Sequence, residues 1–160
     1  MVSKKFKKTA IFSSLDNSKV RKISNQVEEI LNSFGVKILL PKISSIKNEG
    51  KIKYTNEYII RNSDLVIAIG GDGTLLTAAR IFGFYGLPIL GINLGNLGFL
   101  NDVTPRNLTS QLREIFSGNY TSDKRTFLKT TLKDQRQFIS LNEVTIHSSK
   151  IAQLIEYELF

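Results

Sequence analysis

Hydrophobic positions recur with two different periods along the first part of the chain. Residues 9–12, 36–40 and 87–92 are strand-like, mostly apolar segments, and residues 65–69 form a continuous apolar run without alternation, whereas apolar residues within 18–34 recur every three or four positions. Short apolar runs without alternation are typical of strands covered on both faces, and the longer spacing is that of one face of a helix. Strands that alternate with helices predict an α/β domain with a mainly parallel, Rossmann-like sheet.

Residue types at the segment ends refine these boundaries. Residues 54–62, 75–82 and 104–116 are expected to form further helices, and residues 43–53 show no period and are expected to form a loop. Gly35 and Gly118 are expected to end helices, because glycine adopts the left-handed conformation without strain. Thr104 and Pro105 are expected to be the N-cap and first residue of the last helix.

Beyond Gly118 the pattern becomes strand-like, in residues 125–132, 138–146 and 154–160. Three strands are few for an independent sheet, and the last would leave an exposed edge. We therefore expect an α/β nucleotide-binding domain over residues 1–120. Residues 121–160 are expected to supply the first strands of an incomplete all-β, sandwich-like domain.

Composition excludes several classes of site. The 160 residues include no cysteine and one histidine, which excludes disulfides, thiolate nucleophiles and the usual metal centres built on cysteine or several histidines. No apolar run approaches the ~20 residues of a membrane-spanning helix, and no secretory signal is present, so we expect a cytoplasmic protein. The net charge of +8 favours an anionic partner, which could be nucleic acid, an acidic membrane or a phosphorylated small molecule. The dispersed lysines fit a solvated surface equally well.

Glycine is concentrated in one region, since eight of the eleven glycines lie between residues 70 and 98. Gly-Gly-Asp-Gly-Thr, at residues 70–74, follows a predicted strand and precedes a predicted helix, which is where open α/β sheets bind ligands. We expect its glycines to adopt positive φ and let the backbone approach a phosphate, with helix amides pointing at the anion. A tight turn with an N-capping aspartate is the alternative. The segment matches neither the dinucleotide fingerprint nor the P-loop.

Asp72 is the unusual member of this loop. A carboxylate in an anion-binding loop is unfavourable unless it holds a sugar hydroxyl, receives its proton or ligates Mg²⁺. A second cluster, Gly-Ile-Asn-Leu-Gly-Asn-Leu-Gly-Phe-Leu at residues 91–100, also follows a predicted strand. Two such loops are expected to leave the same carboxyl edge of the sheet and form a cleft.

These motifs carry a family resemblance. Gly-Gly-Asp-Gly-Thr is shared by NAD kinases, diacylglycerol kinase-like lipid kinases and phosphofructokinases. With the second cluster and Leu-Asn-Glu-Val at residues 141–144, the chain resembles NAD kinases from its first strand to residue 160. The resemblance implies transfer of the γ-phosphoryl group of ATP, with Mg²⁺ or another divalent cation, to the 2′-hydroxyl of the adenosine ribose of NAD, which gives NADP. It also implies a cytoplasmic homo-oligomer with small-molecule substrates and neither nucleic acid nor membrane as partner.

The resemblance also assigns residues. Asp72 would be the catalytic aspartate that contacts the ribose hydroxyls, and Asn142 and Glu143 would hold the adenosine part of NAD. An amide can pair with an adenine edge, and a carboxylate can accept hydrogen bonds from a ribose diol. The full nucleotide-binding set is Gly70, Gly71, Asp72, Gly73, Thr74, Asn142 and Glu143, and no metal ligand is assigned.

The chain departs from the family pattern in one respect. NAD kinases carry a later Asp-Gly motif and a Gly-Ser/Thr-Thr-Ala-Tyr segment, and neither occurs in these 160 residues. We therefore expect a truncated chain that matches the N-terminal domain and the start of the C-terminal domain. Two alternatives stay open: a lipid kinase of the diacylglycerol type, which should lack the second cluster, and a nucleotide-binding remnant without catalytic activity.

Overall fold

The computed structural model describes residues 6–46, 52–95, 103–147 and 156. The chain divides into two compact units, Met1–Lys124 and Arg125–Phe160. Within the described residues, no helix is both long enough and apolar enough to cross a membrane.

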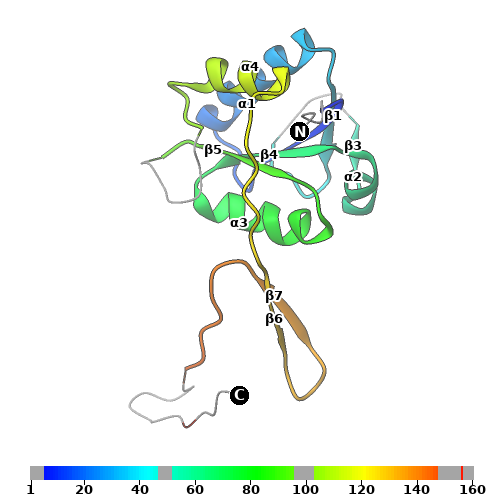
Figure 1. Cartoon of the computed structure of the whole chain (residues 1–160), viewed down its shortest axis with the longest axis vertical. Coiled ribbons are helices and arrows are strands. Elements are labelled where there is room, and N and C mark those ends of the chain that lie inside the picture. Colours follow the sequence, from blue (N-terminus) through cyan, green and yellow to red (C-terminus); the bar gives the residue numbers. More distant parts are fainter. Residues whose placement is uncertain (1–5, 47–51, 96–102, 148–155, 157–160) are drawn as a thin grey trace. The chain divides into compact units, whose positions relative to one another are not determined.

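The first unit is built on a parallel sheet of five strands in the order β3-β2-β1-β4-β5 (Figure 1). The strands are β1 (Lys8–Phe12), β2 (Lys37–Pro41), β3 (Lys53–Tyr54), β4 (Leu65–Gly70) and β5 (Ile89–Asn93). In the centre, Ile67 pairs with Ile11 of β1 and with Leu90 of β5. The order of the strands reverses between β1 and β4, as in Rossmann-like sheets. The predicted α/β fold with a mainly parallel sheet is thereby confirmed.

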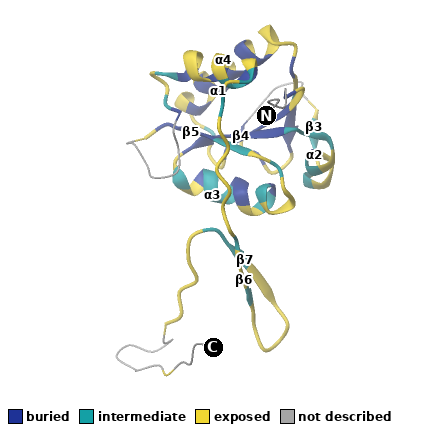
Figure 2. Ribbon diagram, in the orientation of Figure 1, coloured by how far each residue is buried: buried dark blue, intermediate teal, exposed yellow. Residues whose placement is uncertain are grey.

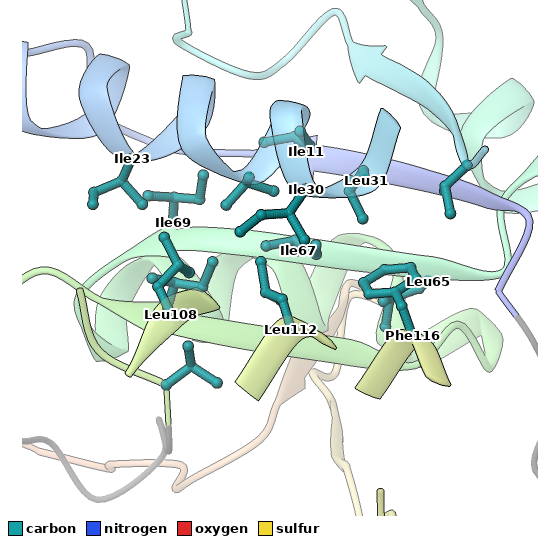
Figure 3. Close-up of a cluster of buried hydrophobic side chains, with 14 of the residues drawn as sticks. Ile11, Ile23, Ile30, Leu31, Leu65, Ile67, Ile69, Leu108, Leu112 and Phe116 are labelled. Atoms are coloured by element: carbon teal, nitrogen blue, oxygen red, sulfur yellow. The ribbon is translucent and has the colours of Figure 1, made fainter. Parts of the chain in front are cut away.

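Helices cover both faces of this sheet. They are α1 (Ser18–Ser33), α2 (Asn56–Asn62), α3 (Asp72–Ile81), α4 (Leu108–Ser117) and the short 3₁₀ helix η1 (Gly83–Tyr85). Residues of α1 and α4 pack in one buried cluster (Figure 3), and residues of α2 and α3 pack in another.

β4 is the centre of both clusters. Leu65, Ile67 and Ile69 belong to the cluster with α1 and α4, whereas Val66 and Ala68 belong to the cluster with α2 and α3. All six residues of β4 are buried, and buried residues are dark blue in Figure 2. Because a strand alternates its side chains between two faces, burial on both faces requires an uninterrupted apolar run. The sequence of β4 has this property, and its strand is therefore predictable.

The ends of α1 are set by two local devices. The Asn17 side chain accepts a hydrogen bond from the backbone N–H of Val20 at 2.9 Å, and Gly35 has a φ of +66° after the last turn. The backbone N–H of Val36 then returns to the carbonyl of Leu31 at 3.0 Å. Gly35 and Gly118, whose φ is +101°, end their helices as the sequence predicts.

Removal of the Asn17 cap should destabilise the protein modestly. We expect Asn17→Ala to lower the free energy of unfolding by about 1 kcal/mol, because an orphan amide of the first turn loses its acceptor. Urea denaturation followed by circular dichroism measures this change. Asn25→Ala, at an exposed position inside α1, is the matched control and should be neutral or slightly stabilising, because alanine is the better helix former. Equal losses in both variants would contradict the capping role.

Two predicted helices begin later than expected. α4 begins at Leu108, because Asn107 Oδ1 accepts from the Thr104 N–H at 2.7 Å and from its hydroxyl at 3.0 Å, which holds residues 104–107 in a turn. Thr104 and Pro105 are therefore not the start of this helix. α2 begins at Asn56, because Tyr54 is paired with Pro41 in the sheet. The predicted loop over residues 43–53 thus ends in a short strand.

The second unit contains an antiparallel pair of strands, β6 (Leu128–Thr131) and β7 (Gln137–Ser140), with Leu128 opposite Ser140. β6 lies inside the predicted strand 125–132, and β7 begins one residue before the predicted strand 138–146; both are shorter than predicted. In particular, residues 141–147 form no regular structure. The third predicted strand, over residues 154–160, lies outside the described residues except for Glu156, which is in no strand.

Candidate active site

The passage from β4 to α3 takes a single residue. β4 ends at Gly70, α3 begins at Asp72, and Gly71 between them has extended backbone angles, with φ of −99° and ψ of −171°. The carbonyl of Gly71 accepts from the N–H groups of Thr74 at 3.0 Å and Leu75 at 3.3 Å. The start of α3 therefore lies at the carboxyl edge of the sheet.

The glycines of this loop serve different purposes. A Cβ on Gly70 would lie 2.3 Å from Thr74 Oγ1 and 2.7 Å from Thr74 Cβ, so only glycine fits against this buried threonine. A Cβ on Gly71 or Gly73 would meet no atom within 4 Å. Gly70 is thus required by packing, whereas Gly71 and Gly73 leave open space beside the backbone.

Two expectations for this loop are wrong. Gly70, Gly71 and Gly73 do not adopt positive φ, because a strand that passes directly into a right-handed helix needs no left-handed residue. The alternative of an N-capping aspartate also fails. Gly71 occupies the N-cap position without a side-chain hydrogen bond, and Asp72 is the first helical residue.

Asp72 lies half-buried in the first turn of α3. A carboxylate at this end of a helix is stabilised by the helix dipole. Within the part of the chain that the structure describes, no three acidic, histidine or cysteine side chains come together as a metal cluster. The neighbouring loop after β1 carries Asp16, whose carboxylate pairs with Arg21 at 2.7 Å.

The second glycine segment begins directly beside the first. Asn93 at the end of β5 pairs with Gly70, and the N–H of Leu94 donates to the Gly70 carbonyl at 2.9 Å. Lys19 Nζ donates to the Leu94 carbonyl, and Asn93 Oδ1 accepts from the Gly95 N–H at 2.9 Å. The prediction that both segments leave the same edge is confirmed as far as Gly95. Residues 96–100 of the motif lie outside the described residues.

Sequence reasoning missed both Asn93 and Lys19. Asn93 could have been found from the sequence, because it is a polar residue directly after a predicted strand and close to a glycine. Such a residue often ends a strand and bonds its side chain to the local backbone. Lys19 gave none, since it lies 75 positions from its partner in the sequence.

Asn142 and Glu143 belong to the second unit. They are separated from the end of β7 by one residue, have no regular structure and are exposed to solvent. Their place in one site with residues 70–74 stays a prediction.

Two hollows of the first unit lie away from the glycine loops. The larger has a volume of about 530 Å³ and is lined by Phe6, Lys7, Phe34, Gly35, Val36, Phe116 and Ser117. The other has a volume of about 410 Å³, and its lining residues are Asn56, Glu57, Ile60, Arg61, Arg80, Ile81 and Tyr85. There, the hydrogen bond from its own backbone, the bond to Thr55 and the charge of Arg61 lower the pKa of Glu57 below its ordinary value. Neither lining includes residues 70–74.

Comparison with known proteins gives concordant results. The family model of the ATP-NAD kinase N-terminal domain matches residues 1–120. An NAD kinase of Tolumonas auensis is 40% identical over 104 residues, which is 62% of this chain and 35% of that protein. An NAD kinase of Buchnera aphidicola subsp. Acyrthosiphon pisum is 44% identical over 101 residues, or 61% of this chain and 35% of the relative. The chain thus spans about a third of the length of the curated relatives it matches.

A solved structure agrees in fold. The crystal structure of yeast NADH kinase complexed with NADH superimposes with a TM-score of 0.67 at 20% identity, over 86% of this chain and 46% of the yeast chain. The family model covers 120 of the 160 residues, among them the whole parallel sheet and the strand-to-helix junction at Gly71. With these matches in sequence and fold, the chain belongs to the NAD kinase family.

Proposed function

We propose that this protein transfers the γ-phosphoryl group of ATP to the 2′-hydroxyl of the adenosine ribose of NAD and so forms NADP. One observation carries the proposal: the single-residue junction at Gly71 presents the Asp72 carboxylate and two open glycines at one edge of the sheet. That edge lies beside the second glycine segment, in a chain of the NAD kinase family.

In this reaction Asp72 orients the ribose hydroxyl and takes up its proton. A bond forms between the 2′-oxygen and the γ-phosphorus, the bond from that phosphorus to the bridging oxygen breaks, and ADP leaves. Phosphoryl transfer passes through a loose transition state, so positioning and charge neutralisation matter more than early deprotonation. A carboxylate that accepts the proton late therefore suffices.

Some of the other candidate residues would bind the substrates, and others hold the backbone of the junction in place. The open space beside Gly71 and Gly73 allows a phosphate to approach the first amides of α3, where a helix start favours anions. Gly70 and Thr74 hold the junction by close packing. Asn142 would pair with the adenine edge and Glu143 would accept hydrogen bonds from the ribose diol.

The carboxylate of the half-buried Asp72, next to the open glycines of the junction, fits a magnesium ion that is shared with the substrate. Mg²⁺ is commonly held by one or two carboxylates together with the phosphates of a nucleotide. Asp72 would supply the carboxylate, and the ion would neutralise phosphate charge. The expected cytoplasmic location and homo-oligomeric state stay proposals that rest on the family resemblance.

The test is NADP formation by the purified chain supplied with NAD, ATP and Mg²⁺, detected with an NADP-dependent dehydrogenase. Calorimetric titration with each nucleotide and an assay with diacylglycerol as acceptor complete the experiment. NADP formation would support the proposal. Nucleotide binding without turnover would favour the non-catalytic remnant, transfer to diacylglycerol would favour the lipid kinase, and no binding at all would overturn the proposal.

A bulky residue at Gly71 should separate binding from folding. We expect Gly71→Val to weaken ATP binding about tenfold, because the side chain fills the space through which a phosphate reaches the backbone amides. The chain should stay folded, because the extended backbone angles suit valine, although valine is a poorer N-cap than glycine and should lower the free energy of unfolding by about 1 kcal/mol. Calorimetric titration measures the affinity, and an unchanged dissociation constant would remove Gly71 from the phosphate site.

A further inference from the structure

The start of the second glycine segment is held from three directions. Leu94 and Gly95 receive contacts from α1, from the end of β5 and from the end of β4. We infer that Asn93 and Lys19 are positioning residues that fix this segment against the phosphate-binding junction at Gly71. The inference rests on the proposed function and adds two residues to that site.

Asn93 closes the base of the loop that follows β5. The residue is 2% exposed, and its Oδ1 accepts from the Gly95 N–H, while its backbone N–H donates to the Val103 carbonyl at 2.8 Å. A parallel β-bridge between Ile92 and Val103 adds a second contact between the two ends of the loop. One residue thus holds the near end of the loop through its side chain and the far end through its backbone.

The burial of Asn93 supports this interpretation. A buried amide is unfavourable unless its polar atoms are hydrogen-bonded, and the neighbouring Ile92 is apolar and fully buried. An apolar residue at position 93 would satisfy the sheet equally well. The bond to Gly95 gives this buried amide a partner and sets the direction of the chain as it leaves the strand.

Lys19 holds the same segment from another element. It is exposed on the first turn of α1, and its ammonium group donates to the Leu94 carbonyl. An ammonium group has three donors, so two are not used by this contact. Lys19 thereby fixes Leu94 and brings a positive charge to the edge at which phosphates are proposed to bind.

Leu94 is also hydrogen-bonded to the strand-to-helix junction between β4 and α3. The N–H of Leu94 donates to the carbonyl of Gly70, the residue before Gly71. A displacement of Leu94 would therefore move the backbone beside the open space at Gly71. Since phosphoryl transfer depends on positioning within about 1 Å, a fixed Leu94 serves the reaction without touching the substrate.

The test compares variants at both residues with matched controls in the 160-residue chain. We expect Lys19→Met to weaken ATP affinity about fivefold and Lys19→Arg to restore most of it, because arginine keeps the donor and the charge. Lys22→Met, which is exposed on the same helix, should leave the affinity unchanged. Asn93→Ala should accelerate amide exchange of Gly95 about tenfold. Asn93→Asp, which keeps the acceptor oxygen, should accelerate it less.

The outcomes separate this inference from the proposed function. If Lys19→Met matches Lys22→Met in affinity and Asn93→Ala leaves the exchange of Gly95 unchanged, the positioning role is wrong, even where Asp72→Asn still abolishes NADP formation. If the unaltered chain binds neither nucleotide, the proposed function and the positioning role fall together. Ser24→Ala, a buried position away from the loops, controls for general loosening of the core and should leave ATP affinity unchanged.

Discussion

Replacement of Asp72 by asparagine is expected to lower NADP formation at least about a hundredfold, the usual range for loss of a positioned acid-base group. Asparagine has nearly the same shape as aspartate, but it neither accepts the proton of the ribose hydroxyl nor offers a charged oxygen to Mg²⁺. The fold should survive, because Asp72 is half-buried in the first turn of α3 and outside both apolar clusters. The loss of its favourable interaction with the helix dipole costs about 0.5 kcal/mol.

Initial rates with NAD and ATP, compared at equal protein concentration, measure the effect. Asp64→Asn is the matched control, because Asp64 is also a half-buried aspartate next to β4 but lies before the strand. Its Oδ2 accepts from the N–H groups of Lys7 at 2.9 Å and Lys8 at 3.0 Å. This variant should lose roughly 1–2 kcal/mol of stability and no turnover per folded molecule. Undiminished turnover in Asp72→Asn would remove Asp72 from catalysis.

A methyl group at Gly70 is expected to destabilise the protein by about 3 kcal/mol, the upper range for overpacking of a well-packed site. The new Cβ would lie 2.3 Å from Thr74 Oγ1 and 2.7 Å from Thr74 Cβ. Thr74 cannot move away easily, because it is 5% exposed and its backbone belongs to the first turn of α3. The strand or the helix must therefore shift.

Urea denaturation of Gly70→Ala, Thr74→Ala and the double variant gives the free energies of unfolding that test this close approach. Loss of Oγ1 leaves the contact to Cβ, so the double variant should recover part of the loss, with a coupling energy of about 1 kcal/mol. Gly71→Ala is the control. No atom lies within 4 Å of its new Cβ, and the extended backbone suits alanine, so its stability should stay within about 0.5 kcal/mol of the unaltered protein. Equal stability of Gly70→Ala and Gly71→Ala would contradict the packing role of Gly70.

The strands and helices of the first unit were largely predictable, because their signals are local and repeated. The apolar run of β4, the apolar face of α1 and the glycine after it all reflect burial or backbone conformation that a single segment determines. β3 escaped prediction because two residues are too few to show a period. The start of α4 was misplaced because the Asn107 side chain turns back to Thr104 and does not cap the helix.

The candidate site was predictable to a smaller extent. The motif at residues 70–74 lies at the junction between strand and helix, as predicted, since the apolar run fixes where the strand ends. The predicted positive φ was wrong because glycine has two separate properties, backbone freedom and the lack of a Cβ, and the sequence does not tell which is used. The contact of Lys19 with Leu94 joins α1 to the segment after β5 across 75 positions of the sequence, so no local pattern reveals it. The roles of Asn142 and Glu143 stay predictions from the family resemblance.

The accessible backbone at the start of α3 lowers the stability of the fold only slightly. Gly71 gives the helix no side-chain cap, yet a glycine at the N-cap position is only about 0.2–0.5 kcal/mol less favourable than serine or aspartate. A larger capping residue would gain this small amount and would place its side chain in the open space. Keeping the first amides of α3 accessible therefore lowers the free energy of unfolding very little. Selection for a more stable domain would leave the open space beside Gly71 intact.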